Sequence, residues 1–99
     1  MLNVYDIKLD SIISQVKGNI ASDMDGETVI MSVKNSKYYN LGRMGGEIWN
    51  RIENPITLNQ VVSELISEYE VEETVCKAQV LTFLELLYKE GLIQIVAEK

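Results

Sequence analysis

The stretch 34-KNSKYYNLGRMGGEIW-49 decides the fold that this sequence predicts. Its residues 37–41 alternate as a β-strand does and include two adjacent tyrosines, a residue type enriched in strands. Three glycines then follow, before an apolar pair that ends in Trp49. Glycines at such positions mark a sharp bend and close packing of the backbone. We therefore expect a strand that turns directly into a helix, with the binding surface of the protein beside that strand.

Length and composition indicate one acidic domain. The 99 residues, 46% of them hydrophobic, can form one core but not two. The net charge of -6 would repel the phosphate backbone of a nucleic acid. No run approaches the roughly 18 apolar residues of a membrane span, and the first ten residues do not have the pattern of a signal peptide. We expect a cytoplasmic location, with no nucleic acid or membrane as partner.

The sequence offers little of the usual chemistry of catalysis. It has no histidine, and Cys76 is its only cysteine. A zinc site of Cys and His ligands therefore has no ligand set, and the thiol has no imidazole to activate it. The residues 42–46 lack the lysine and the hydroxyl of a phosphate-binding loop. We expect no catalytic residue, no metal, no cofactor and no enzymatic activity.

The first half of the chain predicts a three-stranded antiparallel sheet. We interpret residues 1–18 as an extended N-terminal arm. Residues 20–24 and 27–33 flank Asp-Gly, the pair that favours a two-residue hairpin turn. The second of these strands is apolar in its middle, which suggests a central strand, so residues 37–41 become an edge strand with unpaired backbone groups.

The second half predicts three helices and a short closing strand. The helices cover residues 42–53, about 58–69 with Thr57 as N-cap, and 72–90, and residues 92–96 follow Gly91. The last helix carries two apolar stripes, one along Val75, Cys76, Val80, Phe83, Leu86 and Leu87, the other along Lys77, Leu81, Leu84 and Tyr88. Together they exceed the stripe that a surface helix needs, so one of them is free for a ligand or both are core.

This order of elements is an α+β, winged helix-turn-helix-like layout: a three-stranded antiparallel sheet followed by three helices. A helix that reads DNA needs a positive surface. Here the last helix carries Lys77 and Lys89 against four glutamates. A DNA-binding regulator is therefore the less favoured alternative.

Three segments resemble the PqqD-like family of peptide-recognition domains: KYYNLGRMGGEIW, TLNQVVSELISEYEVEE and VLTFLELLYKEGLI. The resemblance covers residues 19–95, so we assign residues 19–99 to such a domain. It implies a non-catalytic protein that binds the leader of a ribosomally made precursor peptide by strand addition. The chain is most similar to the leader-recognition proteins of lasso-peptide biosynthesis, whose partners are a separate cysteine protease and an ATP-dependent cyclase. The alternative is a leader-recognition protein that serves a radical-enzyme pathway of peptide modification.

The resemblance also implies the peptide-binding residues. The added strand would pair with the backbone of Ser36, Lys37, Tyr38, Tyr39, Asn40 and Leu41. The facing wall of the groove would be Lys77, Leu81, Leu84 and Tyr88. Leaders of the lasso type carry a Tyr-x-x-Pro motif, which implies a pocket for a ring and a proline. We further expect Lys34, Arg43 and Arg51, with Lys37, to steer acidic leader residues to this edge.

Overall fold

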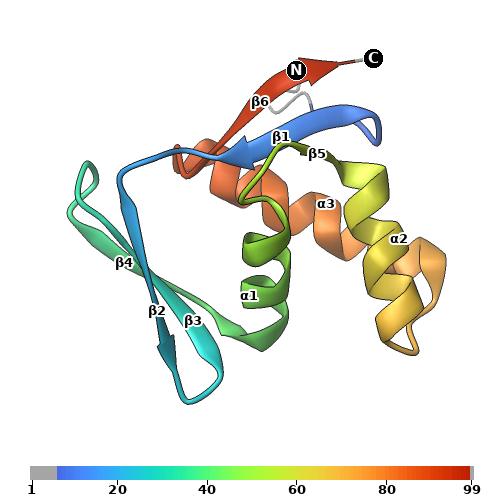
Figure 1. Ribbon diagram of the computed structural model, residues 1–99, viewed down its shortest axis with the longest axis horizontal. Coiled ribbons are helices and arrows are strands. Elements are labelled where there is room, and N and C mark those ends of the chain that lie inside the picture. Colours follow the sequence, from blue (N-terminus) through green and yellow to red (C-terminus); the bar gives the residue numbers. More distant parts are fainter. Residues whose placement is uncertain (1–6, 99) are drawn as a thin grey trace.

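The structure is a computed structural model that describes residues 7–98. The first six residues of the expected N-terminal arm lie outside this range. The described residues fold into two three-stranded sheets and three helices (Figure 1). In chain order the elements are β1 (Ser11–Gln15), β2 (Asn19–Met24), β3 (Glu27–Ser32), β4 (Lys37–Leu41), α1 (Gly42–Arg51), β5 (Ile56–Thr57), α2 (Leu58–Glu68), α3 (Glu73–Lys89) and β6 (Ile93–Glu98).

The predicted sheet is confirmed as an antiparallel meander in the order β2-β3-β4. Asp25 and Gly26 form the turn between β2 and β3, with φ angles of 59° and 86°. Positive φ at both turn residues matches the twist of the two strands. The central strand β3 buries Ile30, which has no exposed surface, whereas β2 and β4 are the two edges.

The turn also determines which backbone groups of β4 are free. A two-residue turn is closed by a hydrogen bond between its flanking residues, here Met24 and Glu27, and bonded pairs then alternate along the strands. The pair of Ser22 and Val29 is therefore bonded. Val29 has thus used its backbone groups on β2 and offers none to Asn40, its partner on β4. By the same alternation, Asn40 and Tyr38 direct their N–H and C=O groups to the open edge.

A second sheet, in the order β5-β1-β6, was not anticipated from the sequence. Residues 11–15 are extended, as expected of the arm, but they form its middle strand, with antiparallel partners on both sides. Ile13 at its centre is fully buried. The partners lie some 40 and 80 residues further along the chain, and such distant pairing leaves no local pattern. Residues 11–15 are thereby part of the same core as the helices.

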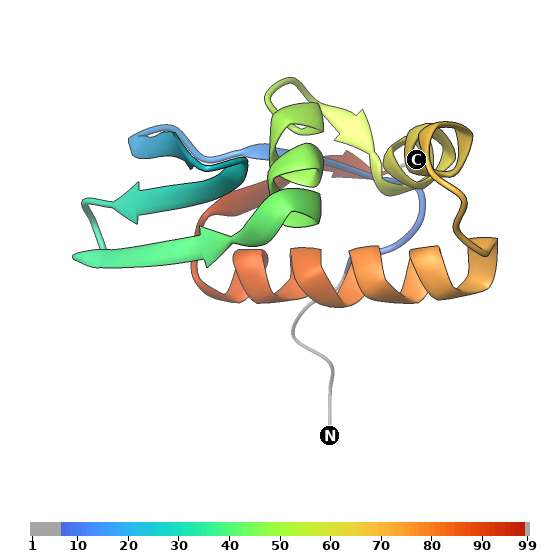
Figure 2. The ribbon, with the colours of Figure 1, turned by 90° about the horizontal axis from the view of Figure 1, so that it is seen from below.

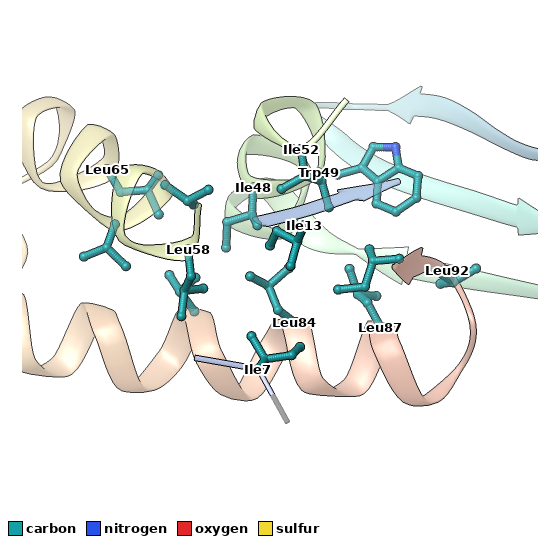
Figure 3. Close-up of a cluster of buried hydrophobic side chains, with 14 of the residues drawn as sticks. Ile7, Ile13, Ile48, Trp49, Ile52, Leu58, Leu65, Leu84, Leu87 and Leu92 are labelled. Carbon is teal, nitrogen blue, oxygen red and sulfur yellow. The ribbon is translucent and has the colours of Figure 1, made fainter. Parts of the chain in front are cut away.

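The helices close the core over these sheets. Figure 3 shows side chains from β1 and all three helices meeting in one cluster. Thr57 caps α2 as expected, its Oγ1 accepting a hydrogen bond of 3.1 Å from the backbone N–H of Gln60. The side chain of Gln60 donates to Glu64. Gly91, with a φ of 79°, follows the end of α3.

Gly46 explains how α1 approaches the first sheet. A Cβ atom placed there would lie 2.1 Å from Oγ1 of Thr28 on β3 and 2.9 Å from its Cβ. The expected packing reason for glycines in this helix is therefore present: the helix backbone and β3 touch where any side chain would separate them.

We predict that Gly46→Ala destabilises the protein by about 1–2 kcal/mol. Overpacking costs about 1–3 kcal/mol, and the better helix propensity of alanine returns up to about 1 kcal/mol. Urea unfolding followed by circular dichroism measures the change. Adding Thr28→Ala should recover part of the loss, because it removes the nearest atom. An unchanged or raised stability of Gly46→Ala would contradict the close approach.

Candidate functional site

The two faces of β4 differ in their surroundings. In the register of the sheet, Tyr39 lies beside the buried Ile30, so Tyr39, Lys37 and Leu41 share the face that points toward the helices. Tyr38, on the other face, has 74% of its surface exposed. The backbone of β4 therefore runs along an open edge, with one row of side chains turned toward α1 and α3.

The last helix faces this row along a stripe that contains Phe83. A Cβ atom on Gly45 would lie 2.9 Å from Cβ of Leu41 and 3.0 Å from Cζ of Phe83, so the three residues meet where β4 becomes α1. One end of α3 lies beside β4 as well, since the hydroxyl of Tyr39 donates to Oε1 of Glu90 at 2.8 Å. At about 100° per residue, the side chains of α3 on this side are Gln79, Phe83, Leu86 and Glu90. Leu86 is 57% exposed, which is unusual for a leucine on a packed helix.

The helix stripe that the resemblance implied lies elsewhere. At 100° per residue, Lys77, Leu81, Leu84 and Tyr88 are rotated by about 100–160° from Phe83 and so away from β4. Leu84 is fully buried and points from α3 into the core (Figure 3). Leu81 and Tyr88 pack partly buried against that core, and Lys77 pairs with Glu73 at 3.0 Å. A side chain without exposed surface cannot contact a bound segment, so Leu84 is not available for the role that the resemblance implied, and the side of α3 that lies beside β4 is that of Phe83.

A network of hydrogen bonds joins the start of β4 to the end of α3, along one end of the expected groove. The side-chain N–H groups of Asn35 donate to the hydroxyl of Tyr39 at 3.1 Å and to the backbone carbonyl of Glu90 at 2.8 Å. Tyr39 in turn donates to the carboxylate of Glu90. Nζ of Lys37 lies 4.0 Å from the same carboxylate. The turn before β4 is thus tied to the end of α3, which sets the width of the groove there.

Beyond the other end of β4, where the strand becomes α1, lies an apolar pocket of about 440 Å³ between α1, α2 and the first half of α3. Its lining is Met44, Gly45, Ile48, Leu65, Tyr69, Val71, Glu72, Val75, Cys76, Gln79, Val80 and Phe83. Val75 and Met44 at its mouth are 50% and 43% exposed. A pocket of this size and lining suits an apolar side chain. Residue composition alone could not place it, because its walls come from three separate helices and a loop.

The expected steering cations are dispersed. Arg51 forms ion pairs with Glu47, Glu64 and Glu68 and has only 13% of its side chain exposed, so its charge is compensated at the junction of α1 and α2. Burial alone would lower the pKa of Arg51, but its hydrogen bonds with Glu68 and Glu47 and the charges of these two carboxylates raise the pKa above its usual value. Arg43 donates to the carbonyl of Asp25 at the tip of the β2–β3 hairpin.

Lys34 lies in the turn before β4 and lines a separate cleft together with Lys17. Only Lys37 belongs to the row of β4 that faces the groove. Its side chain is 63% exposed. Of the four basic residues named from the sequence, it is therefore the one placed to meet a bound segment.

The remaining chemistry of the described residues is sparse. Burial raises the pKa of the Cys76 thiol, which favours its protonated, unreactive form. Residues 7–98 contain no group of three or more side chains arranged to hold a metal ion. No helix in the same range is long and apolar enough to cross a membrane.

Comparisons with known proteins give the fold a family. The structure is similar to that of TbiB1 in complex with the TbiA(beta) leader peptide, with a TM-score of 0.76 and 21% identity over 86% of this chain and 99% of that one. Lasso peptide synthetase B1 complexed with the leader peptide has a TM-score of 0.73 and 21% identity, over 83% and 96% of the two chains.

A third structure is the PqqD truncation of Methylobacterium extorquens PqqCD, described as a stand-alone RiPP (ribosomally synthesized and post-translationally modified) recognition element. Its TM-score is 0.77, with 12% identity over 91% of this chain and 96% of that one. No curated protein matches the sequence. The model of the family "Coenzyme PQQ synthesis protein D (PqqD)" matches residues 27–93, from the start of β3 to the start of β6. This match covers well over half of the chain, which therefore belongs to the PqqD family.

Proposed function

We propose that this protein is a non-catalytic recognition element that binds the leader segment of a ribosomally synthesised precursor peptide. The leader adds to β4 as a further antiparallel strand, and its side chains on the inner face enter the groove between β4 and α3. Antiparallel addition continues the pairing of the whole β2-β3-β4 sheet and is the more stable arrangement per residue. Backbone pairing supplies affinity, and the groove supplies selectivity.

One observation carries this proposal: the N–H and C=O groups of Tyr38 and Asn40 point to the open edge of β4, and an apolar pocket lies beyond the Leu41 end of this strand. Native proteins usually cover or blunt an edge of this kind. The other edge, β2, is exposed along almost its whole length. The edge at β4 is the one that combines unpaired backbone with an apolar pocket, which is what strand addition with side-chain readout requires.

The family and its structural neighbours support the same role. Two of the neighbours hold a leader peptide, and the third is described as a recognition element. Within this proposal, the chain serves a lasso-peptide pathway and presents the leader to a separate cysteine protease and to an ATP-dependent cyclase. A precursor gene beside the gene of this chain, accompanied by genes for those two enzymes, would support this assignment. A neighbouring radical-enzyme gene in their place would assign the chain to the alternative pathway.

The direct experiment uses a fluorescein-labelled synthetic leader from a precursor encoded beside the gene of this chain. Fluorescence anisotropy should give saturable binding at micromolar or lower concentration, and a scrambled peptide of the same composition should bind at least about tenfold more weakly. Equal binding of the two peptides would contradict recognition of the leader.

The groove wall can be tested with Phe83→Ala. We expect this change to weaken leader binding about tenfold, because a partly buried aromatic side chain at the centre of a contact often contributes more than 1 kcal/mol. Lys77→Ala on the opposite side of α3 is the control and should leave the affinity unchanged. Circular dichroism confirms that both variants are folded. A larger loss of leader affinity in Lys77→Ala than in Phe83→Ala would show that the leader contacts the side of α3 that the resemblance implied.

A further inference from the structure

The groove between β4 and α3 has two chemically different ends. Figure 2 shows α3 running below the sheet, with the β3–β4 turn near one end and the loop between α2 and α3 at the other. Lys37 lies at the first end. The residues 68–73 at the second end include four glutamates and no cation. The pocket opens at this second, acidic end, where Glu72 is among its lining residues.

Much of the charge at each end is available to a ligand. Glu68 is paired with Arg51, and Glu73 with Lys77. Within residues 7–98, Glu70 and Glu72 form no ion pair. Glu72 does accept a hydrogen bond of 3.1 Å from the backbone N–H of Val75 at the start of α3.

At the other end, Lys37 reaches Glu90 only at 4.0 Å. Because Oε1 of Glu90 already accepts from Tyr39, the exposed ammonium of Lys37 has room for a second carboxylate.

The direction of the added strand determines which end of the ligand meets the pocket and which end meets Lys37. A segment antiparallel to β4 has its upstream end beyond Leu41, over the pocket, and its downstream end at Lys37. The 17 residues of α3 measure about 25 Å, a distance that about eight extended residues span. A bound segment of about eight extended residues would therefore meet both ends at once.

We infer that the bound segment is charge-polarised: a cationic residue upstream, beside Glu70 and Glu72; a large apolar side chain next, in the pocket; and an acidic residue downstream, beside Lys37. The cationic and acidic residues lie about six to eight positions apart. This inference rests on the proposed function and adds to it the substrate class and the reading direction. It makes Lys37 a specificity-determining residue of the groove.

The test is selection from a displayed library of random 12-residue peptides on the full chain. Enriched sequences should carry Lys or Arg upstream, an aromatic or large aliphatic residue next, and Asp or Glu downstream, at the stated spacing. A synthetic consensus peptide should bind about tenfold more tightly than the version with its cationic and acidic residues exchanged, because attraction at two partly exposed sites becomes repulsion. Enriched sequences without this order, or in the opposite order, would overturn the inference, as would equal binding of the two synthetic peptides.

A charge exchange on the protein assigns the downstream contact. Lys37→Glu should weaken binding of the consensus peptide several-fold. This variant should bind a peptide whose downstream acid is replaced by lysine more tightly than the consensus peptide. Lys77→Glu, the same change on the far side of α3, should do neither. Failure of the proposed function is a separate result: selected peptides would then bind Asn40→Pro as well as the parent protein, or no peptide would be enriched.

Discussion

Replacing Asn40 with proline is expected to reduce leader affinity by about tenfold to a hundredfold while the protein remains folded. The alternation that starts at the Asp25–Gly26 turn directs the N–H of Asn40 to the open edge. Proline removes this donor and leaves a carbonyl of the added strand unpaired, which costs about 1–3 kcal/mol. Anisotropy titration with the labelled leader measures the loss.

Three further proline variants make this result specific. Tyr38→Pro should act in the same way, and it spares the hydrogen bond that the Asn40 side chain accepts from the N–H of Gly42. Ala21→Pro removes an outward N–H from β2, the other edge of the same sheet, and should leave the affinity unchanged. Tyr39→Pro removes a donor that points inward to β3, so it should lower the stability of the sheet itself. Normal binding by folded Asn40→Pro and Tyr38→Pro would exclude strand addition at β4.

The second large effect is on stability. Leu84→Ala is expected to lower the free energy of unfolding by about 2–5 kcal/mol, because the side chain is fully buried among the residues of the core. Urea unfolding measures this loss. The folded fraction of the variant should bind leader with unchanged affinity, since Leu84 does not border the groove.

Leu86→Ala is the matched control, the same substitution two positions further along α3. Leu86 is 57% exposed, so we expect it to cost less than about 1 kcal/mol of stability and to weaken binding instead. If Leu86→Ala instead lowered the stability and Leu84→Ala lowered the affinity, the side of α3 that carries Leu84 would border the leader.

Local patterns were sufficient to predict most of the fold. Asp25–Gly26 predicted the hairpin, Thr57 the start of α2 and Gly91 the end of α3, and the structure confirms each of these. Each depends on backbone conformation or capping within a few residues. The sheet of β5, β1 and β6 does not, because its strands come from distant parts of the chain.

Peptide addition at β4 stays a prediction, whereas the facing wall was predicted on the side of α3 where the structure buries Leu84 completely. Both sides of this helix carry apolar residues, so hydrophobic periodicity could not say which side is core. In the structure, Gly45 lies beside both Leu41 of β4 and Phe83, so the side of α3 that carries Phe83 faces β4. The exposure of Val75 and Leu86 belongs to the same side. Charge was similarly ambiguous, since Arg51 is basic in sequence but compensated by three carboxylates in space.

Amide hydrogen exchange of the free and leader-bound protein tests the central claim most directly. If the leader adds to β4, the amides of Tyr38 and Asn40 exchange fast in the free protein and become strongly protected when the leader binds. The amides of Ala21 and Asp23, on the edge of β2, should not change. Protection that appears on β2, or leader binding that leaves Tyr38 and Asn40 unprotected, would contradict strand addition at β4.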